Sequence, residues 1–212
     1  YLGIDQQERA ITTLPFNYSY GMSILNSHLR AGASIVLTDR TFFDAAFWHT
    51  VKTNGVTTMA GVPYTYEMLL KLRLERMDLP QLRTLTQAGG KMAVAQTRRV
   101  AEICKAKGFR FYTMYGQTEA SPRMAFLSPE FAEAKIGSIG RAIPGGRLWL
   151  EDEQGAVITS HSQTGELVYS GPNVALGYAL NQEDLVRGDD WCGVLHTGDL
   201  AREDEEGFFF IE

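Results

Sequence analysis

The sequence is poor in cysteine: Cys104 and Cys192 are the only two among 212 residues. They form no CxxC motif and no pair of histidines stands near them, so neither a redox motif nor a zinc site is indicated. Disulfides are rare in reducing compartments. The pattern therefore predicts two reduced, buried thiols and a cytoplasmic protein.

Long apolar runs and blocks of lysine and arginine are also missing. No apolar run reaches the roughly 18 residues of a membrane-spanning helix, and the first ten residues, YLGIDQQERA, lack the basic and apolar regions of a signal peptide. The formal net charge is −5. A membrane span is thus not expected, and nucleic acid and anionic membranes have little electrostatic support as partners.

What the sequence does contain is an alternation of strand and helix patterns, in a composition that is 44% hydrophobic and 21% charged, typical of globular proteins. Residue patterns predict strands over 9–15, 33–38, 56–61, 82–87 and 109–115, and helices over 21–32, 44–55, 64–76 and 93–108. Asp44 is the expected N-cap of the second helix. Consecutive βαβ units predict an α/β fold with a mainly parallel sheet flanked by helices.

The pattern changes after about residue 134. Short alternating runs at 145–159, 165–171, 193–204 and 207–212 are separated by turn residues and predict a small antiparallel, β-barrel-like part. We therefore expect two subdomains, residues 1–133 and 134–212, with residues 127–135 as the linker.

Glycines, hydroxyls and aromatic residues follow the predicted strands, at 16–21, 61–63, 88–91 and 115–121. Ligands of parallel sheets bind beyond the carboxyl ends of the strands, so these segments form a candidate site. Gly89 and Gly90 would let a ligand approach the backbone, although a plain turn also explains them.

The segment YGQTE, residues 115–119, has the most specific chemistry. Tyr115 offers a flat face for a planar ring, Thr118 a hydroxyl for a phosphate, and Glu119 carboxylate oxygens suited to Mg²⁺. The alternative is structural: Thr118 would cap a helix whose first turn contains Glu119.

Four motifs, in order, resemble those of the AMP-forming adenylating enzymes, which include acyl- and aryl-CoA synthetases, luciferases and the adenylation domains of peptide synthetases. They are QAGGKM (87–92), MYGQTEAS (114–121), GELVYSGPNVALGY (165–178) and LHTGDLAREDEEGFFFIE (195–212). The resemblance implies an enzyme that activates a carboxylic acid with Mg-ATP to an acyl-adenylate. The acyl group then passes to the thiol of coenzyme A or of a carrier protein.

The resemblance also implies roles for individual residues. ATP or AMP would be bound by Gly89, Gly90, Lys91, Tyr115, Gly116, Gln117, Thr118 and Asp199. Tyr115 would stack on the adenine, and Asp199 would accept hydrogen bonds from the ribose hydroxyls. Thr118 would contact the α-phosphate and Glu119 would hold Mg²⁺, which makes these two the expected catalytic residues.

The acid is expected to lie near PFNYSYGM, residues 15–22. The implied substrate-binding residues are Asn17, Tyr18, Ser19, Gly21 and Ala88. Peptide-synthetase adenylation domains carry an aspartate where Asn17 stands, and Asn17 has no charge to pair with an ammonium group. Many acyl- and aryl-CoA synthetases carry a histidine where Tyr18 stands. The departures favour a plain carboxylic acid over an amino acid, but they do not identify the acid.

Parts of the family pattern are absent: the phosphate loop, the hinge, and the C-terminal lid with its lysine. We therefore expect a central fragment of a longer enzyme, with little or no adenylation of its own. The leading interpretation is an acid–CoA or acid–carrier-protein ligase. The alternatives are a peptide-synthetase adenylation domain and a nucleotide-binding module without ligase activity. The oligomeric state stays open.

Overall fold

The computed structural model describes all 212 residues, which form two compact units. The first unit consists of residues 1–113 and 127–137, and the second of residues 114–126 and 138–212. No helix of the structure combines the length and the apolar composition of a membrane span. The functional subdomains predicted at 1–133 and 134–212 stay a prediction.

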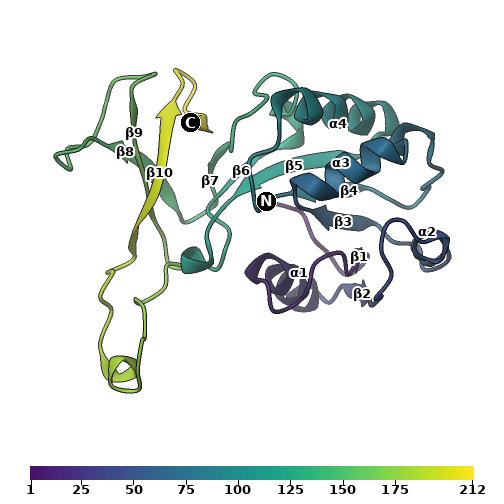
Figure 1. The fold of residues 1–212 in the computed structure, drawn as a ribbon, viewed down its shortest axis with the longest axis horizontal. Coiled ribbons are helices and arrows are strands. Elements are labelled where there is room, and N and C mark those ends of the chain that lie inside the picture. The colour runs from purple at the N-terminus through teal and green to yellow at the C-terminus, as the bar shows by residue number, and fades with distance from the viewer. The chain divides into compact units, whose positions relative to one another are not determined.

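The first unit is built on parallel strands (Figure 1). Its strands lie in the order β2-β1-β3-β4-β5, and every register pair among them is parallel. Their bounds are β1 Arg9–Ile11, β2 Ser34–Val36, β3 Thr58–Gly61, β4 Thr84–Gln87 and β5 Arg110–Tyr115, whose last two residues belong to the second unit. The intervening helices are α1 Ser19–Arg30, α2 Ala45–Thr53, α3 Pro63–Lys71 and α4 Val94–Lys107. Each of the predicted strands and helices in this part is present.

Two local details differ from the sequence-based expectation. The helix predicted over 64–76 ends at Lys71, because Arg73 adopts a left-handed backbone conformation with φ of 60°, and a short 3₁₀ turn, Leu74–Arg76, follows. Asp44 does occupy the N-cap position of α2, but its carboxylate accepts a hydrogen bond from the Thr41 amide at 2.9 Å. It therefore closes the preceding loop and does not cap the helix.

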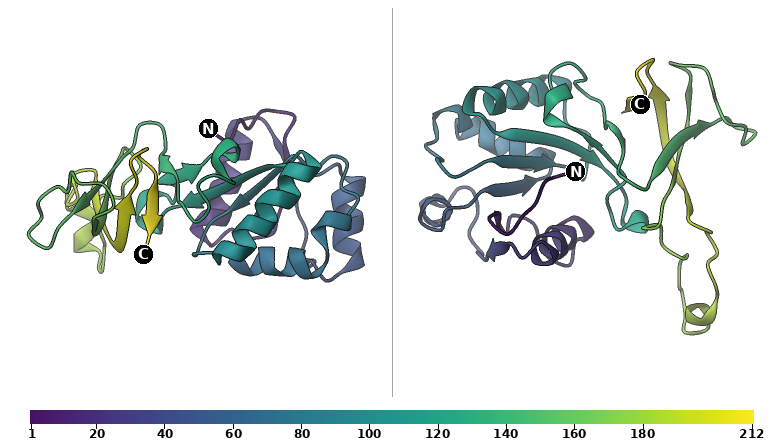
Figure 2. Two further views of the ribbon diagram at one scale, coloured as in Figure 1. Left: turned by 90° about the horizontal axis from the view of Figure 1, so that it is seen from above. Right: turned by 180° about the vertical axis from the view of Figure 1, so that it is seen from behind.

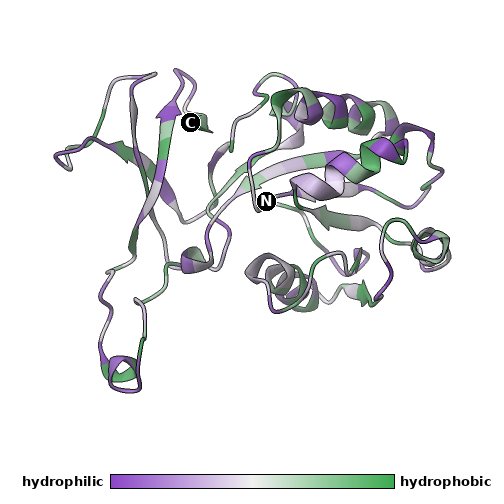
Figure 3. Ribbon diagram, viewed as in Figure 1, coloured by the Kyte–Doolittle hydropathy of each residue, from purple (hydrophilic) through white to green (hydrophobic).

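One face of this sheet is apolar. Met59, Leu85 and Phe111 lie side by side on β3, β4 and β5, and they pack in one cluster with buried residues of α2, α3 and α4, such as Phe47 and Leu69. Figure 3 shows hydrophobic and hydrophilic stretches alternating along α3 and α4, as expected of helices that cover a sheet with one side only. This cluster is the hydrophobic core of the first unit.

The opposite face carries polar side chains and is covered by α1. Thr86 lies beside Leu85 on β4 and therefore points to the other face. The Tyr20 hydroxyl of α1 lies 2.7 Å from Thr86 Oγ1. In Figure 2, α1 lies across the strands from α3 and α4. Helices thus cover both faces of the parallel sheet, as in other α/β folds.

A buried carboxylate joins three strands on this polar face. Glu8 stands just before β1 and is 4% exposed. It accepts hydrogen bonds from the Thr57 hydroxyl, from Thr58 Oγ1 at 2.8 Å and from Arg110 Nη2 at 3.0 Å. Burial raises the pKa of this carboxyl, but the two threonine hydroxyls and Arg110 outweigh burial and lower the pKa below its usual value. Glu8 therefore stays ionised inside the unit.

The cysteines are both free, and they lie in different surroundings. Cys104 belongs to the apolar cluster, and burial raises the pKa of its thiol to about 12. Cys192 is exposed. The expectation of two buried thiols was thus right for Cys104 and wrong for Cys192, which lies in a loop just before β10.

The second unit is built on antiparallel strands. Its four-stranded sheet has the order β11-β10-β9-β8, and β6 and β7 form an antiparallel pair that follows β5 in the other, seven-stranded sheet. The bounds are β6 Ala125–Leu127, β7 Arg141–Ala142, β8 Arg147–Glu151, β9 Thr164–Ser170, β10 Val194–Glu203 and β11 Phe209–Ile211. Leu167 and Tyr169 of β9 are fully buried in its core. The predicted fold class, a mainly parallel α/β sheet with a small antiparallel β part, is confirmed.

The segment predicted as a linker does not run free. Residues 127–137 belong to the first unit, and Ala132 packs into its apolar cluster. Glu133 also accepts a hydrogen bond from Lys105 Nζ at 2.5 Å. The segment is therefore part of a folded unit.

Candidate functional site

A β-bulge in the second unit shapes the TGD segment, Thr197–Asp199. His196 of β10 pairs with Val168 of β9, and Leu200 pairs with Glu166, so three residues of β10 stand opposite a single residue of β9. Gly198 adopts φ of 72°, a left-handed conformation that glycine reaches without strain. Bulges bend a strand and re-aim its side chains, often at functional sites. Here Asp199 is the last of the three bulged residues.

The bulge has its own hydrogen bonds to β9. The Thr197 hydroxyl donates to the Leu167 carbonyl at 2.6 Å, and the Gly198 amide donates to Glu166 Oε1 at 3.0 Å. These bonds replace the regular ladder that the extra residues interrupt. The sequence TGD is thus suited to the bulge as well as to any chemistry of Asp199.

Asp199 contacts the end of β5. The Tyr115 hydroxyl donates to Asp199 Oδ2 at 2.5 Å. Gln117 Nε2 donates to the Thr197 carbonyl at 2.8 Å and lies 3.3 Å from Asp199 Oδ2. Two motifs that are far apart in the sequence, YGQTE and HTGD, therefore meet within the second unit.

The environment keeps Tyr115 protonated. Burial raises the pKa of its phenol well above the ordinary value, and the hydrogen bond to Asp199 raises it further. The phenol is therefore a hydrogen-bond donor at any physiological pH. Asp199 is half-buried, and an ionised carboxylate has two oxygens with about four acceptor positions in all. It can thus accept further hydroxyl groups from a ligand.

Gly116 is needed for packing. A Cβ atom at this position would coincide with the Pro122 carbonyl oxygen. The close contact with Pro122 therefore explains why YGQTE has a glycine at this position. Whether a nucleotide also contacts Gly116, as the resemblance implies, stays a prediction.

Thr118 and Glu119 begin a 3₁₀ turn, Thr118–Ala120, and not an α-helix. Gln117 occupies the N-cap position, and no side chain caps the turn. The structural alternative, in which Thr118 caps a helix and Glu119 complements its dipole, therefore does not describe this segment. Thr118 is exposed and Glu119 half-buried, so both side chains can reach a ligand.

Glu119 accepts hydrogen bonds from two residues of the GELVYSGPNVALGY motif. Its carboxylate accepts a hydrogen bond from the Tyr178 hydroxyl at 2.6 Å, and its carbonyl accepts one from the Ala175 amide at 2.7 Å. The hydrogen bond to Glu119 raises the pKa of Tyr178. The Tyr178 ring packs edge-on against Trp191, with ring centroids 5.0 Å apart. Tyr178 is thus a site residue that the sequence analysis placed in a motif without giving it a role.

The residues present fit one hard cation bound mainly by a ligand. No group of three or more histidine, cysteine, aspartate or glutamate side chains is arranged to hold a metal ion. Mg²⁺ is usually bound by one or two carboxylates, with substrate phosphates and waters completing the shell. Glu119, a single carboxylate beside the exposed Thr118, provides what such a site requires from the protein.

The other predicted site residues lie in the first unit, where two of the segments meet. The Tyr18 hydroxyl, beyond β1, lies against the α-carbon of Gly89, beyond β4, where a Cβ atom would collide with it. Gln87 Nε2 donates to the Gly90 carbonyl at 2.8 Å and holds the double-glycine turn. The predicted acid segment and the predicted adenine loop are therefore neighbours at the carboxyl edge of the parallel sheet.

The remaining predicted residues of the first unit differ in exposure. Asn17 and Lys91 are exposed, Ser19 and Ala88 are half-buried, and Gly21 is buried. A Cβ atom at Gly21 would overlap the Pro15 carbonyl oxygen, so close packing explains this glycine. The exposed Asn17 and Lys91 can meet a ligand, whereas Gly21 can act only by shaping the turn.

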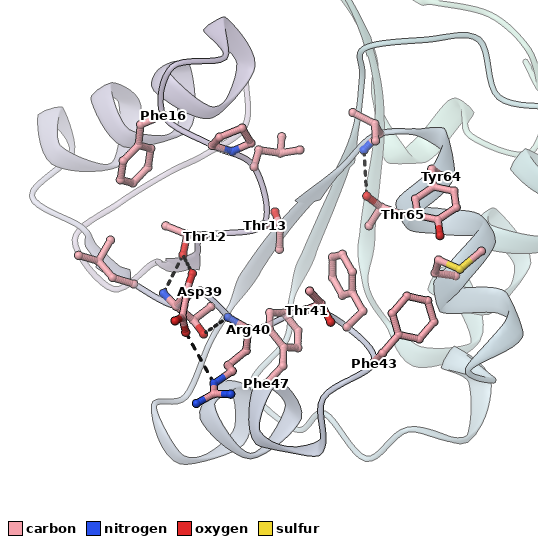
Figure 4. A pocket seen from close by; sticks show the side chains of 17 residues that line it. Thr12, Thr13, Phe16, Asp39, Arg40, Thr41, Phe43, Phe47, Tyr64 and Thr65 are labelled. Atoms are coloured by element: carbon pink, nitrogen blue, oxygen red, sulfur yellow. Dashed lines mark hydrogen bonds and ion pairs between the residues drawn. The ribbon is translucent and has the colours of Figure 1, made fainter.

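The first unit also contains a cavity of about 870 Å³ beyond β1, β2 and β3. Because β1 lies between β2 and β3, this is a topological switch point, where α/β proteins commonly bind ligands. Figure 4 shows Thr12 and Asp39 on one wall and Tyr64 and Thr65 on the facing wall. None of the five predicted acid-binding residues lines it. Pro15 and Phe16, the first two residues of the predicted acid segment, do line it, so the cavity adjoins the start of that segment.

Comparison with known proteins gives a consistent result. Residues 1–179 match the family model described as AMP-binding enzyme. The chain is 33% identical over 211 residues to a 2-succinylbenzoate–CoA ligase of Bacillus cereus, in an alignment that covers 99% of the chain and 42% of that protein. It is 34% identical over 212 residues to the protein of the same name from another strain of that species, Q1, with the same coverage.

Solved structures agree in fold. The o-succinylbenzoate coenzyme A synthetase (MenE) of Bacillus subtilis, in complex with ATP and magnesium ion, superimposes with a TM-score of 0.82 at 29% identity, over 99% of this chain and 42% of that chain. The N-terminal domain of FACL13 from Mycobacterium tuberculosis gives a TM-score of 0.83 at 21% identity, over 99% of this chain and 52% of that chain, which supports the fold alone. The chain thus spans about 42% of the length of the curated relatives it matches.

Proposed function

Because the chain belongs to the family of AMP-binding enzymes, we propose that it forms the nucleotide- and acid-recognition part of an AMP-forming ligase that joins a carboxylic acid to a thiol. The contact between Tyr115 and Asp199 is the observation that carries this proposal. It assembles an aromatic face and a half-buried acceptor carboxylate, which are the groups that an adenine and a ribose need.

In this proposal, the Tyr115 ring stacks on the adenine and Asp199 accepts the two ribose hydroxyls. The Tyr115 phenol, kept protonated by burial and by Asp199, orients the carboxylate by donating to Oδ2. Since Gly89 and Gly90 form a held turn after β4, we assign them and Lys91 to the adenine edge. These roles come from the family resemblance, and the local geometry supports them.

Thr118 and Glu119 act on the phosphates. The exposed Thr118 hydroxyl donates to the α-phosphate, and Glu119 offers carboxylate oxygens to Mg²⁺. The metal, when bound, neutralises the charge that develops as pyrophosphate leaves. For this role Glu119 must share or lose the hydrogen bond that it accepts from Tyr178.

We propose that the substrate is a carboxylic acid without an ammonium group, and that the acceptor is coenzyme A. Asn17 offers no charge for an ammonium group, and the relatives are named as CoA ligases. Their acid, 2-succinylbenzoate, is the first candidate substrate to test. A carrier-protein thiol is the second possible acceptor.

The chain spans only 42% of these relatives, so we assign turnover to the longer enzyme. The 212-residue chain by itself is expected to bind nucleotide without appreciable adenylation.

The test is acid-dependent release of pyrophosphate from Mg-ATP by the complete enzyme that carries this chain. Supplying 2-succinylbenzoate, benzoate, a fatty acid and an amino acid in parallel identifies the substrate class, and adding coenzyme A tests the acceptor. Release with a carboxylic acid and not with the amino acid is expected. Release with the amino acid alone would favour a peptide-synthetase adenylation domain, and AMP binding without any release would favour a nucleotide-binding module.

A further inference from the structure

The peptide bond between Thr197 and Gly198 is held on both sides by side chains. Its carbonyl oxygen, on Thr197, accepts a hydrogen bond from Gln117 Nε2 at 2.8 Å. Its amide, on Gly198, donates to Glu166 Oε1 at 3.0 Å. A trans peptide is planar, with its C=O and N–H pointing in opposite directions. Gln117 and Glu166 therefore hold the rigid Thr197–Gly198 peptide group by hydrogen bonds from opposite sides.

This peptide group depends on side-chain hydrogen bonds more than the other peptide groups of β10 do. It lies in the bulge, where the ladder between β9 and β10 is interrupted. It also precedes Gly198, which has φ of 72° and, as a glycine, readily exchanges between backbone conformations. A reorientation of the plane would displace the next residue, Asp199.

We propose that Gln117 and Glu166 are positioning residues that lock the Thr197–Gly198 peptide and thereby aim the Asp199 carboxylate at the ribose hydroxyls of the nucleotide. This inference rests on the proposed function, because it takes the ribose as the ligand of Asp199. The two side chains come from different parts of the second unit, Gln117 from the segment between β5 and the Thr118–Ala120 turn, and Glu166 from β9. Neither needs to touch the nucleotide for this role.

The chemistry of the two side chains suits the two ends of the peptide. The Glu166 carboxylate is an acceptor only, and hydrogen bonds to an ionised acceptor are stronger than neutral ones. The Gln117 amide donates two hydrogens, and the distances place both Thr197 O and Asp199 Oδ2 within its reach, at 2.8 and 3.3 Å. Gln117 thus links the locked peptide to the carboxylate that it positions.

These two hydrogen bonds should raise the fraction of molecules in which Asp199 is already oriented for the ligand. If the plane is unlocked, only a fraction of the molecules present Asp199 correctly, and the apparent affinity falls by that fraction. Removing a hydrogen bond to a charged group is expected to change such an equilibrium by about tenfold. The effect must be confined to ligands that possess ribose hydroxyls.

The experiment compares AMP with 2′,3′-dideoxy-AMP, titrated calorimetrically into the purified protein. We expect Glu166→Ala to weaken AMP binding about 5- to 10-fold, with less than about 2-fold change for the dideoxy nucleotide. Glu166→Gln keeps an oxygen that can accept the Gly198 amide and should restore AMP affinity to within about 3-fold. Glu153→Ala, an exposed glutamate in the turn after β8, is the matched control and should change neither affinity.

Equal losses for both nucleotides in Glu166→Ala, or no loss of AMP affinity in that variant, would overturn the inference while leaving the proposed function intact. A wild-type protein that binds neither nucleotide would overturn both. Amide hydrogen exchange at Gly198 gives an independent readout without nucleotide. Exchange should be faster in Glu166→Ala than in the wild type and slow again in Glu166→Gln, and unchanged exchange in Glu166→Ala would show that the peptide is not held in this way.

Discussion

Two carboxylates, Glu8 in the first unit and Asp199 in the second, show how the same group serves different ends. Glu8 is 4% exposed and is paired with Arg110, a full cation, besides two threonine hydroxyls. Asp199 is half-buried, and Tyr115 and Gln117, the side chains that donate to it, are neutral. The first arrangement neutralises a charge inside the protein, and the second leaves acceptor capacity for a ligand.

Burial and the charge of the partners thus separate a structural carboxylate from a functional one. Glu8 connects β1, β3 and β5, so its loss should affect folding. Asp199 and Glu119 are half-buried, and we assign them to the nucleotide and its metal, so their loss should affect binding and chemistry. The following predictions test this contrast, beginning with the largest effect.

The largest effect is expected from Glu119→Ala. Removing the carboxylate that we assign to Mg²⁺ should slow acid-dependent pyrophosphate release by about 10²–10³-fold, since a bound metal supplies several kcal/mol of charge stabilisation. The free energy of unfolding, from urea titration, should change by less than about 0.5 kcal/mol. Glu205→Ala, at an exposed position, is the control. A loss of folding with unchanged specific activity would make Glu119 a structural residue.

Glu8→Ala should do the reverse. The change leaves Thr57, Thr58 and Arg110 without their shared acceptor, which we expect to lower the free energy of unfolding by about 2–3 kcal/mol. Urea titration followed by circular dichroism measures this loss. AMP affinity, measured on the protein that remains folded, should stay within about 2-fold of the wild type. An unchanged free energy of unfolding would show that Glu8 does not stabilise the fold.

The pH dependence sharpens the same point. Because the pKa of Glu8 is lower in the folded protein than its usual 4.5, its contribution to stability is complete above about pH 4.5 and is lost as the pH falls through the folded-state pKa. Unfolding titrations from about pH 7 to about pH 3 should therefore show a steeper loss of stability in the wild type than in Glu8→Gln. Parallel curves would contradict this account of Glu8.

The smallest effect is expected at Tyr178. Its hydroxyl donates to Glu119, and a bound Mg²⁺ would compete with that hydrogen bond. In Tyr178→Phe, the concentration of Mg²⁺ needed for half-maximal nucleotide binding should therefore fall by about 2- to 5-fold. A rise in this concentration would instead mean that Tyr178 orients Glu119 for the metal. Titration of Mg²⁺ at fixed ATP distinguishes the two.

The fold class could be predicted from the sequence because the strand and helix patterns, the glycines that end them and the order of the elements all indicate the same fold. Strand and helix runs alternate with glycine stops, and consecutive βαβ units allow few topologies. The predicted end of α3 was wrong because the positive φ of Arg73 occurs at a residue type that does not usually indicate a left-handed backbone. The linker at 127–135 was wrong because the packing of Ala132 depends on a distant surface.

The candidate site was predictable as motifs, but the contacts inside it were not. YGQTE and HTGD were recognised separately, and their meeting through Tyr115 and Asp199 depends on how β5 and β10 come together. Glu166 and Tyr178 stood inside a recognised motif, which was the available signal, although their partners were not apparent. Glu8 carried no signal, since its cluster unites residues from three strands.

In the proposed function, Asp199 is held ready for the ribose of an adenine nucleotide. Calorimetric titration of AMP into the wild type and into Asp199→Asn tests it most directly, because asparagine keeps the shape of the side chain and removes its charge. We predict saturable binding by the wild type and about 10- to 100-fold weaker binding by Asp199→Asn, with the stability of the fold unchanged. Equal affinity of the two proteins for AMP would contradict the account.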